Sequence, residues 1–189
     1  DDEDRRNVDA LAKHLNGNAA FAVDVNRGWT FDQAQRWLPV LKDYNVQWLE
    51  EPLAADEESQ MDRLRAASGL PIAGGENVLM PPGFDANDAR SLPFDILQPD
   101  LTKNAPVHVA KRVLDAVGQS DKRIIPHFLG SAPGQAASLH FAAGCPDGLV
   151  EMDINRNPLR TDLFSEPFEV VDGRIRIPDA PGIGWRLKE

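Results

Sequence analysis

Hydrophobic residues recur along most of the chain in two alternating patterns, one typical of helices and the other of buried strands. The first segment carries its apolar residues at the spacing of one helix face: Val8, Leu11, Ala12 and Leu15. Asn16-Gly17 then provides a favourable helix stop. AAFAVDVN, residues 19–26, is a short apolar run that ends in polar residues, as buried strands do. The sequence therefore predicts a helix over about residues 4–16, followed by a strand.

The same alternation continues to residue 152. Thr30 predicts the start of the next helix, because its hydroxyl can accept from the first unpaired backbone N–H groups. The remaining pattern predicts strands near 46–50, 71–75, 94–98, 123–126 and 148–152, separated by helices near 57–68, 83–91, 105–118 and 132–143. Strands that alternate with helices in this way are typical of parallel βαβ units, in either a doubly wound sheet or a (β/α)₈ barrel. The Asp-Gly pair of PFEVVDGRIRIP, residues 167–178, predicts a hairpin.

The composition of the chain excludes some classes of binding partner and indicates a cellular compartment. With 30 acidic and 20 basic residues the chain carries a formal charge of −10, so neither nucleic acid nor an anionic membrane surface is expected as its main partner. The single Cys145 allows no intrachain disulfide and fits a reducing compartment. No apolar stretch approaches the ~20 residues that span a bilayer, and DDEDRRNVDA does not resemble a leader. We expect a cytoplasmic protein.

Every predicted strand ends in an ionisable group, and parallel α/β folds place their active sites at these ends. The polar residues there are Asp24 with Asn26, Glu50 with Glu51, Glu76 with Asn77, Asp100, His127, and Glu151 with Asp153. A random surface would scatter such residues over helix faces and loops. The set as a whole therefore indicates a catalytic site.

Asp24, Glu50 and Glu76 are spaced by 26 residues each, about one βα repeat. On neighbouring strands the three carboxylates would converge and repel one another unless a cation lay between them. Hard oxygen donors without nearby cysteine or paired histidine favour Mg²⁺, with Mn²⁺ as an alternative. Each carboxylate could instead cap a helix or pair with an arginine or lysine.

Asp100 and His127 end the next two strands. A carboxylate that is hydrogen-bonded to an imidazole raises the pKa of the imidazole and selects its tautomer. A histidine that acts as a general acid or base requires both effects. An ordinary buried histidine is the alternative, and we adopt it for the histidines on predicted helices: His14, His108 and His140. Glu151 could stabilise an oxyanion, or form a salt bridge with Arg156 or Arg160.

Six motifs together resemble a known family: VDVN, WLEEPL, GEN, LQPD, PHFLG and VEMDINRNPLR. They occur in the order and spacing of the enolase superfamily, and resemble its mandelate racemase group most closely. The resemblance runs from about Val8 to Gly184. It implies a (β/α)₈ barrel with Mg²⁺ bound by three carboxylates, a histidine–aspartate dyad, and a carboxyl group that stabilises an enolate.

Carried over motif by motif, the resemblance assigns the metal ligands to Asp24, Glu50 and Glu76, the dyad to Asp100 and His127, and the enolate-stabilising group to Glu151. Three further residues are expected to support the ligands: Asn26, Glu51 and Asn77. For Glu51 the reason is strand alternation, which points it away from Glu50.

The sequence differs from the muconate-lactonising group of the same superfamily, and it also differs from the family at one loop. The muconate-lactonising group fits less well, because its catalytic lysine ends the sixth barrel strand and a histidine at the seventh is not its pattern. Lys103 here lies three residues beyond Asp100. Ala105-Pro106 stands where the family often has Gly-Gly, which leaves the shape of this loop open.

Family members also have an N-terminal capping domain and two preceding strands, the second carrying a Lys-x-Lys motif with the other acid or base. We expect this chain to hold about six of the eight barrel strands, without cap or second base. Residues 1–162 would be the partial barrel and residues 163–189 a hairpin tail that packs toward the cap. Such an open barrel should need the missing part of the same protein, a homo-oligomer, or both.

The implied reaction is removal of the proton next to the carboxylate of a small acid. Dehydration of an acid sugar to a 2-keto-3-deoxy acid is the first interpretation, because the histidine–aspartate group is rich in such enzymes. A racemase or epimerase of a 2-hydroxy acid is the alternative. The third is a catalytically silent fragment that folds, associates or binds metal without turnover.

Overall fold

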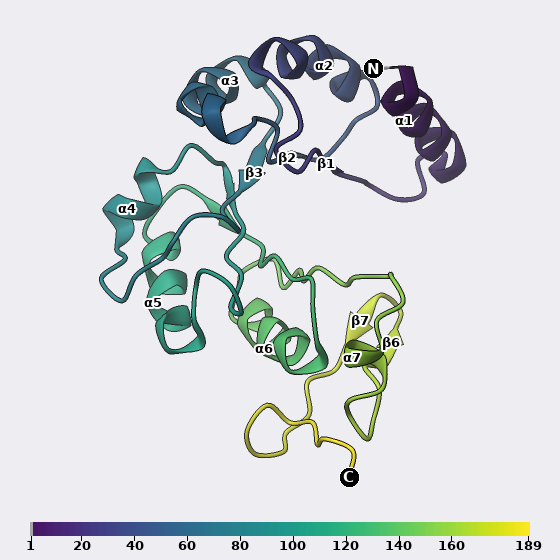
Figure 1. Cartoon of the computed structure of the whole chain (residues 1–189), viewed down its shortest axis with the longest axis vertical. Coiled ribbons are helices and arrows are strands. Elements are labelled where there is room, and N and C mark those ends of the chain that lie inside the picture. Colours follow the sequence, from purple (N-terminus) through teal and green to yellow (C-terminus); the bar gives the residue numbers. More distant parts are fainter. Residues whose placement is uncertain (1) are drawn as a thin grey trace. The chain divides into compact units, whose positions relative to one another are not determined.

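Residues 2–189 are described by a computed structural model in which helices alternate with short strands (Figure 1). The chain divides into two compact units. The first unit comprises Asp1–Gly74 with Pro93–Asp95, and the second unit comprises Gly75–Leu92 with Ile96–Glu189. Within residues 2–189, no helix has both the length and the apolar character that crossing a membrane requires.

The first unit contains three strands and the helices that connect them. In chain order its elements are α1 (Asp2–Leu15), β1 (Val23–Asp24), α2 (Phe31–Asp43), β2 (Leu49–Glu50), the 3₁₀-helix η1 (Ala55–Gln60), α3 (Met61–Ser68) and β3 (Ile72–Gly74). The strands are parallel, with β2 between β1 and β3. Asp24 lies opposite Glu50, and Glu50 lies opposite Ala73. The predicted βαβ order is confirmed in this unit.

Helix α2 begins where the sequence predicts it. The Thr30 hydroxyl accepts from the backbone N–H of Gln33, and the Gln33 side chain accepts from the backbone N–H of Thr30 at 2.8 Å. This capping box satisfies two N–H groups that would otherwise lack a partner at the helix start. The apolar face of α2 is buried, with Ala34 and Leu41 fully inside the core of the first unit.

The second unit contains two parallel strands, four helices and a hairpin among its described residues. Its elements are α4 (Ala86–Ser91), β4 (Ile96–Leu97), α5 (Val107–Gly118), β5 (Arg123–Ile124), α6 (Ala132–Ala143), α7 (Pro158–Thr161), β6 (Val170–Val171) and β7 (Arg174–Ile175). Leu97 of β4 lies opposite Ile124 of β5. Asp172 and Gly173 have φ of 49° and 72°, the left-handed conformation that a tight two-residue hairpin turn requires. The predicted hairpin is confirmed.

The prediction of a sixth strand near residues 148–152 is wrong, because none of these residues belongs to a strand of the structure. Side chains hold this segment. Gln135 Nε2 donates to the carbonyl oxygen of Glu151 at 3.1 Å, and the Glu151 carboxylate accepts from the backbone N–H of Phe128 at 2.8 Å. The Glu151 carbonyl is satisfied by a glutamine side chain and does not need a partner from a neighbouring strand.

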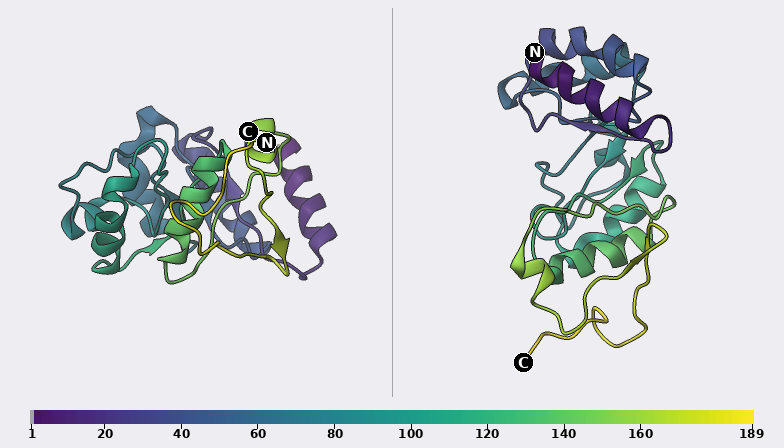
Figure 2. Two further views of the ribbon diagram at one scale, coloured as in Figure 1. Left: turned by 90° about the horizontal axis from the view of Figure 1, so that it is seen from below. Right: turned by 90° about the vertical axis from the view of Figure 1, so that its right-hand side faces the viewer.

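The C-terminal tail packs against helix α6, beside which it runs in Figures 1 and 2. Phe164, Phe168 and Trp185 form one aromatic cluster, with ring centroids 4.9–6.3 Å apart. The cluster covers Ala132 and Ala136, whose small side chains let the rings approach the helix. Burial of these large rings is what attaches the tail to the second unit.

Gly74, the last residue of β3, leaves no room for a larger side chain. A Cβ added there would lie 2.6 Å from the Phe94 ring. We therefore expect Gly74→Ala to lower the free energy of unfolding by about 1–3 kcal/mol, as overpacked cores do. Urea denaturation should show the change as a lower midpoint.

Gly118 is the matched control for this substitution, since a Cβ added there meets no atom within 4 Å. Gly118→Ala should leave the midpoint unchanged or raise it slightly. Equal midpoints for Gly74→Ala and the unmodified protein would contradict the proposed clash with Phe94.

Candidate active site

Asp24 and Glu50 end two adjacent parallel strands of the first unit. They are register partners, so their side chains leave the same face of the sheet. Asp24 Oδ1 accepts from the backbone N–H of Asn26 at 2.8 Å, and Asn26 has φ of 48°. Glu50 Oε2 accepts from Trp48 Nε1 at 3.2 Å. The structure thus places two of the three predicted metal ligands, with Asn26 as a support for one of them, at a single sheet end.

Glu51 differs from Glu50 in burial and in backbone conformation. Its φ is 37°, so the chain leaves the extended conformation directly after β2, and the residue is only 6% exposed. Strand alternation, the reason given for the orientation of Glu51, requires extended backbone and does not apply to this residue. A supporting role for Glu51 stays a prediction. Its backbone N–H donates to Ala73 at 3.0 Å and its carbonyl accepts from Arg27 at 2.7 Å. These bonds hold the turn that follows the strand.

In the second unit, Asp100 and His127 form a close pair. His127 Nδ1 lies 3.0 Å from Asp100 Oδ2, and the Asp100 side chain is only 4% exposed. The other oxygen of Asp100 accepts from the backbone N–H and the hydroxyl of Thr102, both at 2.7 Å. The carboxylate is thereby fixed on both sides, and it fixes the orientation of the imidazole.

The pair shifts the pKa of both members. Burial by itself lowers the pKa of His127, but the hydrogen bond with Asp100 and the charges of Glu151 and Glu76 outweigh it, so the pKa is raised. Burial raises the pKa of Asp100, and the hydrogen bonds from His127 and Thr102 outweigh it, so the pKa is lowered. Both shifts favour an imidazolium beside a carboxylate.

Glu76 lies against the opposite nitrogen of the same imidazole. Glu76 Oε2 is 2.6 Å from His127 Nε2, and Glu76 Oε1 is 2.8 Å from Lys103 Nζ. Asn77 Nδ2 donates to the same Oε1 at 3.2 Å. Pairing with a lysine was the alternative that the sequence left open for this carboxylate. Both oxygens of Glu76 thus face cationic groups.

Glu151 completes the cluster around His127 Nε2. Its Oε2 lies 3.8 Å from that nitrogen while accepting from Phe128 N–H, and the side chain is 45% exposed. Arg160, one of two suggested partners for Glu151, pairs with Asp153, and both of these side chains are almost fully buried. The cluster therefore has an oxygen that solvent or a substrate can reach.

Several supporting residues of this cluster were not predicted. Thr102, Asn104 and Gln135 each bind a site loop through the side chain. Thr102 carries a local signal, because a residue two positions after an aspartate commonly donates to its carboxylate. Gln135 has no such signal, because its partner Glu151 lies 16 residues away in sequence. The two partners of Asn104 Nδ2 lie 26 and 29 residues away, so these contacts have no local signal either.

The donor chemistry fits a hard divalent cation. Asp24, Glu50 and Glu76 offer only carboxylate oxygens. The one cysteine is no thiolate ligand, since burial and the charge of Asp147 raise the pKa of Cys145 to about 11. No three or more His, Cys, Asp or Glu side chains within residues 2–189 gather into a group that could hold a metal ion. The metal assignment therefore rests on donor chemistry, on the placement of Asp24 and Glu50 at one sheet end, and on the family resemblance.

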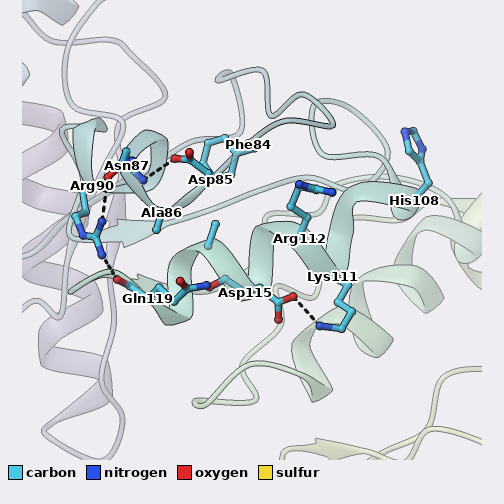
Figure 3. A pocket seen from close by; sticks show the side chains of 11 residues that line it. Phe84, Asp85, Ala86, Asn87, Arg90, His108, Lys111, Arg112, Asp115 and Gln119 are labelled. Carbon is cyan, nitrogen blue, oxygen red and sulfur yellow. Dashed lines mark hydrogen bonds and ion pairs between the residues drawn. The ribbon is translucent and has the colours of Figure 1, made fainter.

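A hollow of about 760 Å³ elsewhere in the second unit is lined by residues of α4 and α5 (Figure 3). None of the predicted site residues lines it. Arg90 donates to Asn87 and to the carbonyl of Gln119, and Lys111 pairs with Asp115 at 2.6 Å. Two of its basic groups are thus engaged by near neighbours.

Comparison with known proteins supplies the family. The model of the family described as "Enolase C-terminal domain-like" matches residues 1–189. The chain belongs to the enolase superfamily. In this superfamily the C-terminal domain is a (β/α)₈ barrel, and the parallel strands and connecting helices of both units are part of such a barrel. The predicted resemblance and fold class are confirmed.

Named relatives of this enolase superfamily chain are enzymes. The D-galactarolactone cycloisomerase of Agrobacterium fabrum is 31% identical over 196 residues, which cover 98% of this chain and 51% of that protein. The arabinonate dehydratase of Saccharolobus solfataricus is 26% identical, covering 100% of this chain and 50% of that protein. The chain therefore spans about half the length of these relatives.

Among solved structures, a member of the enolase superfamily from Polaromonas sp. JS666 is similar, with a TM-score of 0.84 and 29% identity. The match covers 98% of this chain and 50% of that protein. The barrel portion of this chain is accordingly a partial one.

The buried pair Asp153–Arg160 makes stability depend on pH. The backbone N–H of Asn155 lowers the pKa of Asp153, burial opposes this, and Arg160 lowers it further. A lowered pKa stabilises the fold above the unfolded value of about 3.9, and the contribution is lost as the pH falls through the folded value. Asp153→Asn should therefore lower the urea midpoint at neutral pH, by an amount that shrinks below about pH 4.

Asp179→Asn, at a side chain that is 99% exposed, serves as control and should change the midpoint little at either pH. A deficit of Asp153→Asn that stays constant across the acidic range would show that the charge of Asp153 is not what stabilises this loop.

Proposed function

We propose that the protein containing this chain removes the proton next to the carboxylate of a small acid, most specifically in the dehydration of an acid sugar to a 2-keto-3-deoxy acid. One observation carries the proposal: a single imidazole, His127, is held by buried Asp100 on one nitrogen and faces two carboxylates with the other. The dehydratase named among the relatives supports the same reaction class.

In the proposed reaction, His127 is the group that moves a proton at Nε2. The α C–H bond and the bond from the β-carbon to its hydroxyl break, and Nε2 supplies the proton with which the hydroxyl leaves as water. The resulting enol then becomes the keto acid. Asp100 keeps Nδ1 engaged, so Nε2 is the nitrogen that exchanges. The family resemblance assigns the base for the α-proton to a Lys-x-Lys segment, which these 189 residues do not contain.

Asp24, Glu50 and Glu76 would hold Mg²⁺, or alternatively Mn²⁺, and Asn26, Glu51 and Asn77 would support them. The bound ion would supply positive charge against the negative charge that develops on the substrate carboxylate. Glu151 would stabilise the same charge by hydrogen bonding. In this structure Lys103 and His127 provide positive charge to Glu76, which supports the view that this carboxylate is built to face a cation.

The proposal includes the organisation of the whole protein. Residues 1–162 would belong to its catalytic barrel, and residues 163–189 to a tail packing toward a capping domain. The proposal also includes a cytoplasmic location. It further includes a homo-oligomer, or association of this chain with the rest of the same protein. The half-length match to the relatives supports a second half that completes the barrel.

An isomerase on the same scaffold is the second candidate, because a cycloisomerase is also among the relatives. The two reactions can be distinguished by their products. A racemase or epimerase would introduce deuterium from D₂O at the α-carbon without a keto product, whereas the dehydratase would give a semicarbazone-reactive keto acid.

Removal of the imidazole tests the proposed proton transfer. In the protein containing this chain, His127→Asn should lower turnover of acid sugars by about a hundredfold or more, since a positioned acid or base contributes about that much. Turnover is measured across an acid-sugar panel with Mg²⁺. His108→Asn, at an exposed position on α5, should retain activity. An unmodified protein with no turnover on any panel member would favour the silent-fragment alternative.

Glu50→Gln tests the metal assignment without relying on turnover. Loss of one carboxylate should weaken Mg²⁺ binding in a calorimetric titration by about tenfold or more, since even outer partners of metal ligands are worth about 10–100-fold. Glu166→Gln changes an exposed glutamate outside the proposed ligands and should leave the affinity unchanged. Equal Mg²⁺ affinity in Glu50→Gln and the unmodified protein would remove Glu50 from the ligand set.

A further inference from the structure

Asn104 is a buried amide within the loop that follows Asp100. The residue is only 5% exposed, yet every polar atom of its side chain has a partner. Its Oδ1 accepts from the backbone N–H of Asp100 at 2.9 Å. Its Nδ2 donates to the carbonyls of Gly75 and Val78, both at 2.5 Å. One acceptor and two donor contacts determine which way the amide points.

These contacts join two loops that carry different site residues. Gly75 and Val78 flank Glu76, and Asp100 is the partner of His127. The backbone adds a further tie, because Met80 N–H donates to the carbonyl of Asn104 at 3.0 Å. Asn104 Nδ2 therefore binds the Glu76 loop on both sides of the glutamate, while Oδ1 binds the backbone of the Asp100 loop.

The Asp100 loop is compact enough to act as an anchor. The backbone N–H groups of Lys103, Asn104 and Ala105 all point to the carbonyl of Asp100, at 3.2, 3.1 and 2.9 Å. Ala105 is fully buried. The shape that the sequence left open at Ala105-Pro106 is thus a tight turn, and it presents the Asn104 side chain to the neighbouring loop.

We propose that Asn104 is a positioning residue that sets Glu76 against the Asp100–His127 pair. Without the amide, the carbonyls of Gly75 and Val78 would lose their side-chain donor. The 2.6 Å contact between Glu76 and His127 would then lose a loop support that acts in addition to the contacts of Glu76 with Lys103 and Asn77. As a catalytic statement this rests on the proposed function, whereas the positioning itself can be measured without any turnover.

Asn104→Asp is the sharpest variant, because it keeps the shape of the side chain but replaces the donor with a charged acceptor facing two carbonyls. Amide hydrogen exchange at Met80 should become about tenfold faster or more as the loop contact opens. The ¹⁵N and ¹H signals of the His127 imidazole, recorded at one fixed pH, should shift as Glu76 moves. Asn104→Ala removes the same donor without adding charge and should change both readouts in the same direction.

Asn157→Asp is the matched control. Asn157 Nδ2 likewise joins two loops, by donating to the carbonyl of Gly130 at 3.0 Å, but it makes none of the contacts to the Glu76 loop described for Asn104. This variant should leave exchange at Met80 within about twofold of the unmodified protein, well short of the loss of a buried hydrogen bond.

The outcomes separate the possibilities. Faster exchange together with shifted imidazole signals in both Asn104 variants supports the proposal. Faster exchange with unchanged imidazole signals would reduce Asn104 to a loop stabiliser and overturn its positioning role, as would no change in either readout. Absence of turnover in the unmodified protein would count against the proposed function and leave these two measurements valid.

Discussion

The second unit depends on the sharing of one imidazole by three carboxylates. His127 lies between Asp100, Glu76 and Glu151, at 3.0, 2.6 and 3.8 Å. Three carboxylates this close would repel one another strongly if nothing positive lay among them. The ammonium of Lys103 offsets part of that repulsion, and the raised pKa of His127 favours an imidazolium that offsets more of it. The charge balance explains why these loops can approach one another, and it prepares His127 to exchange protons.

Side-chain amides maintain the arrangement where strands are too short to do so. The parallel strands of the second unit contain two residues each, so most of the site lies on loops beyond them. Asn104 joins the Glu76 and Asp100 loops, while Gln135 and Asn157 bind the segments around Glu151 and His127. Of the three, Asn104 and Gln135 are buried and Asn157 is partly exposed. Asn104 holds its loops firmly, because all its side-chain polar atoms are paired and an unpaired polar group inside the protein is costly.

The three carboxylates that the family resemblance assigns to the metal each lie at or just beyond the end of a parallel strand. Asp24 and Glu50 end adjacent strands of the first unit, and Glu76 follows the last strand of that unit at the start of the second. All three are carboxylates at the ends of parallel strands, the location at which α/β folds bind ligands. The relatives that share the fold are enzymes about twice as long as this chain. The proposed chemistry therefore belongs to the protein as a whole.

Local signals in the sequence determined the helices, the Thr30 capping box and the Asp172-Gly173 turn, because each depends on residues only a few positions apart. The same is true of the strand ends, where the order of apolar and ionisable residues along the chain is enough to identify the candidate site. Tertiary structure decided the rest. The segment near residues 148–152 reads as a strand, yet it is held by Gln135, and Glu51 leaves the extended conformation on which strand alternation depends. Lys103 Nζ and Asn104 Nδ2 meet their partners across 26–29 residues. No local pattern specifies such contacts, because they arise only when loops from separate βα repeats are brought together by packing.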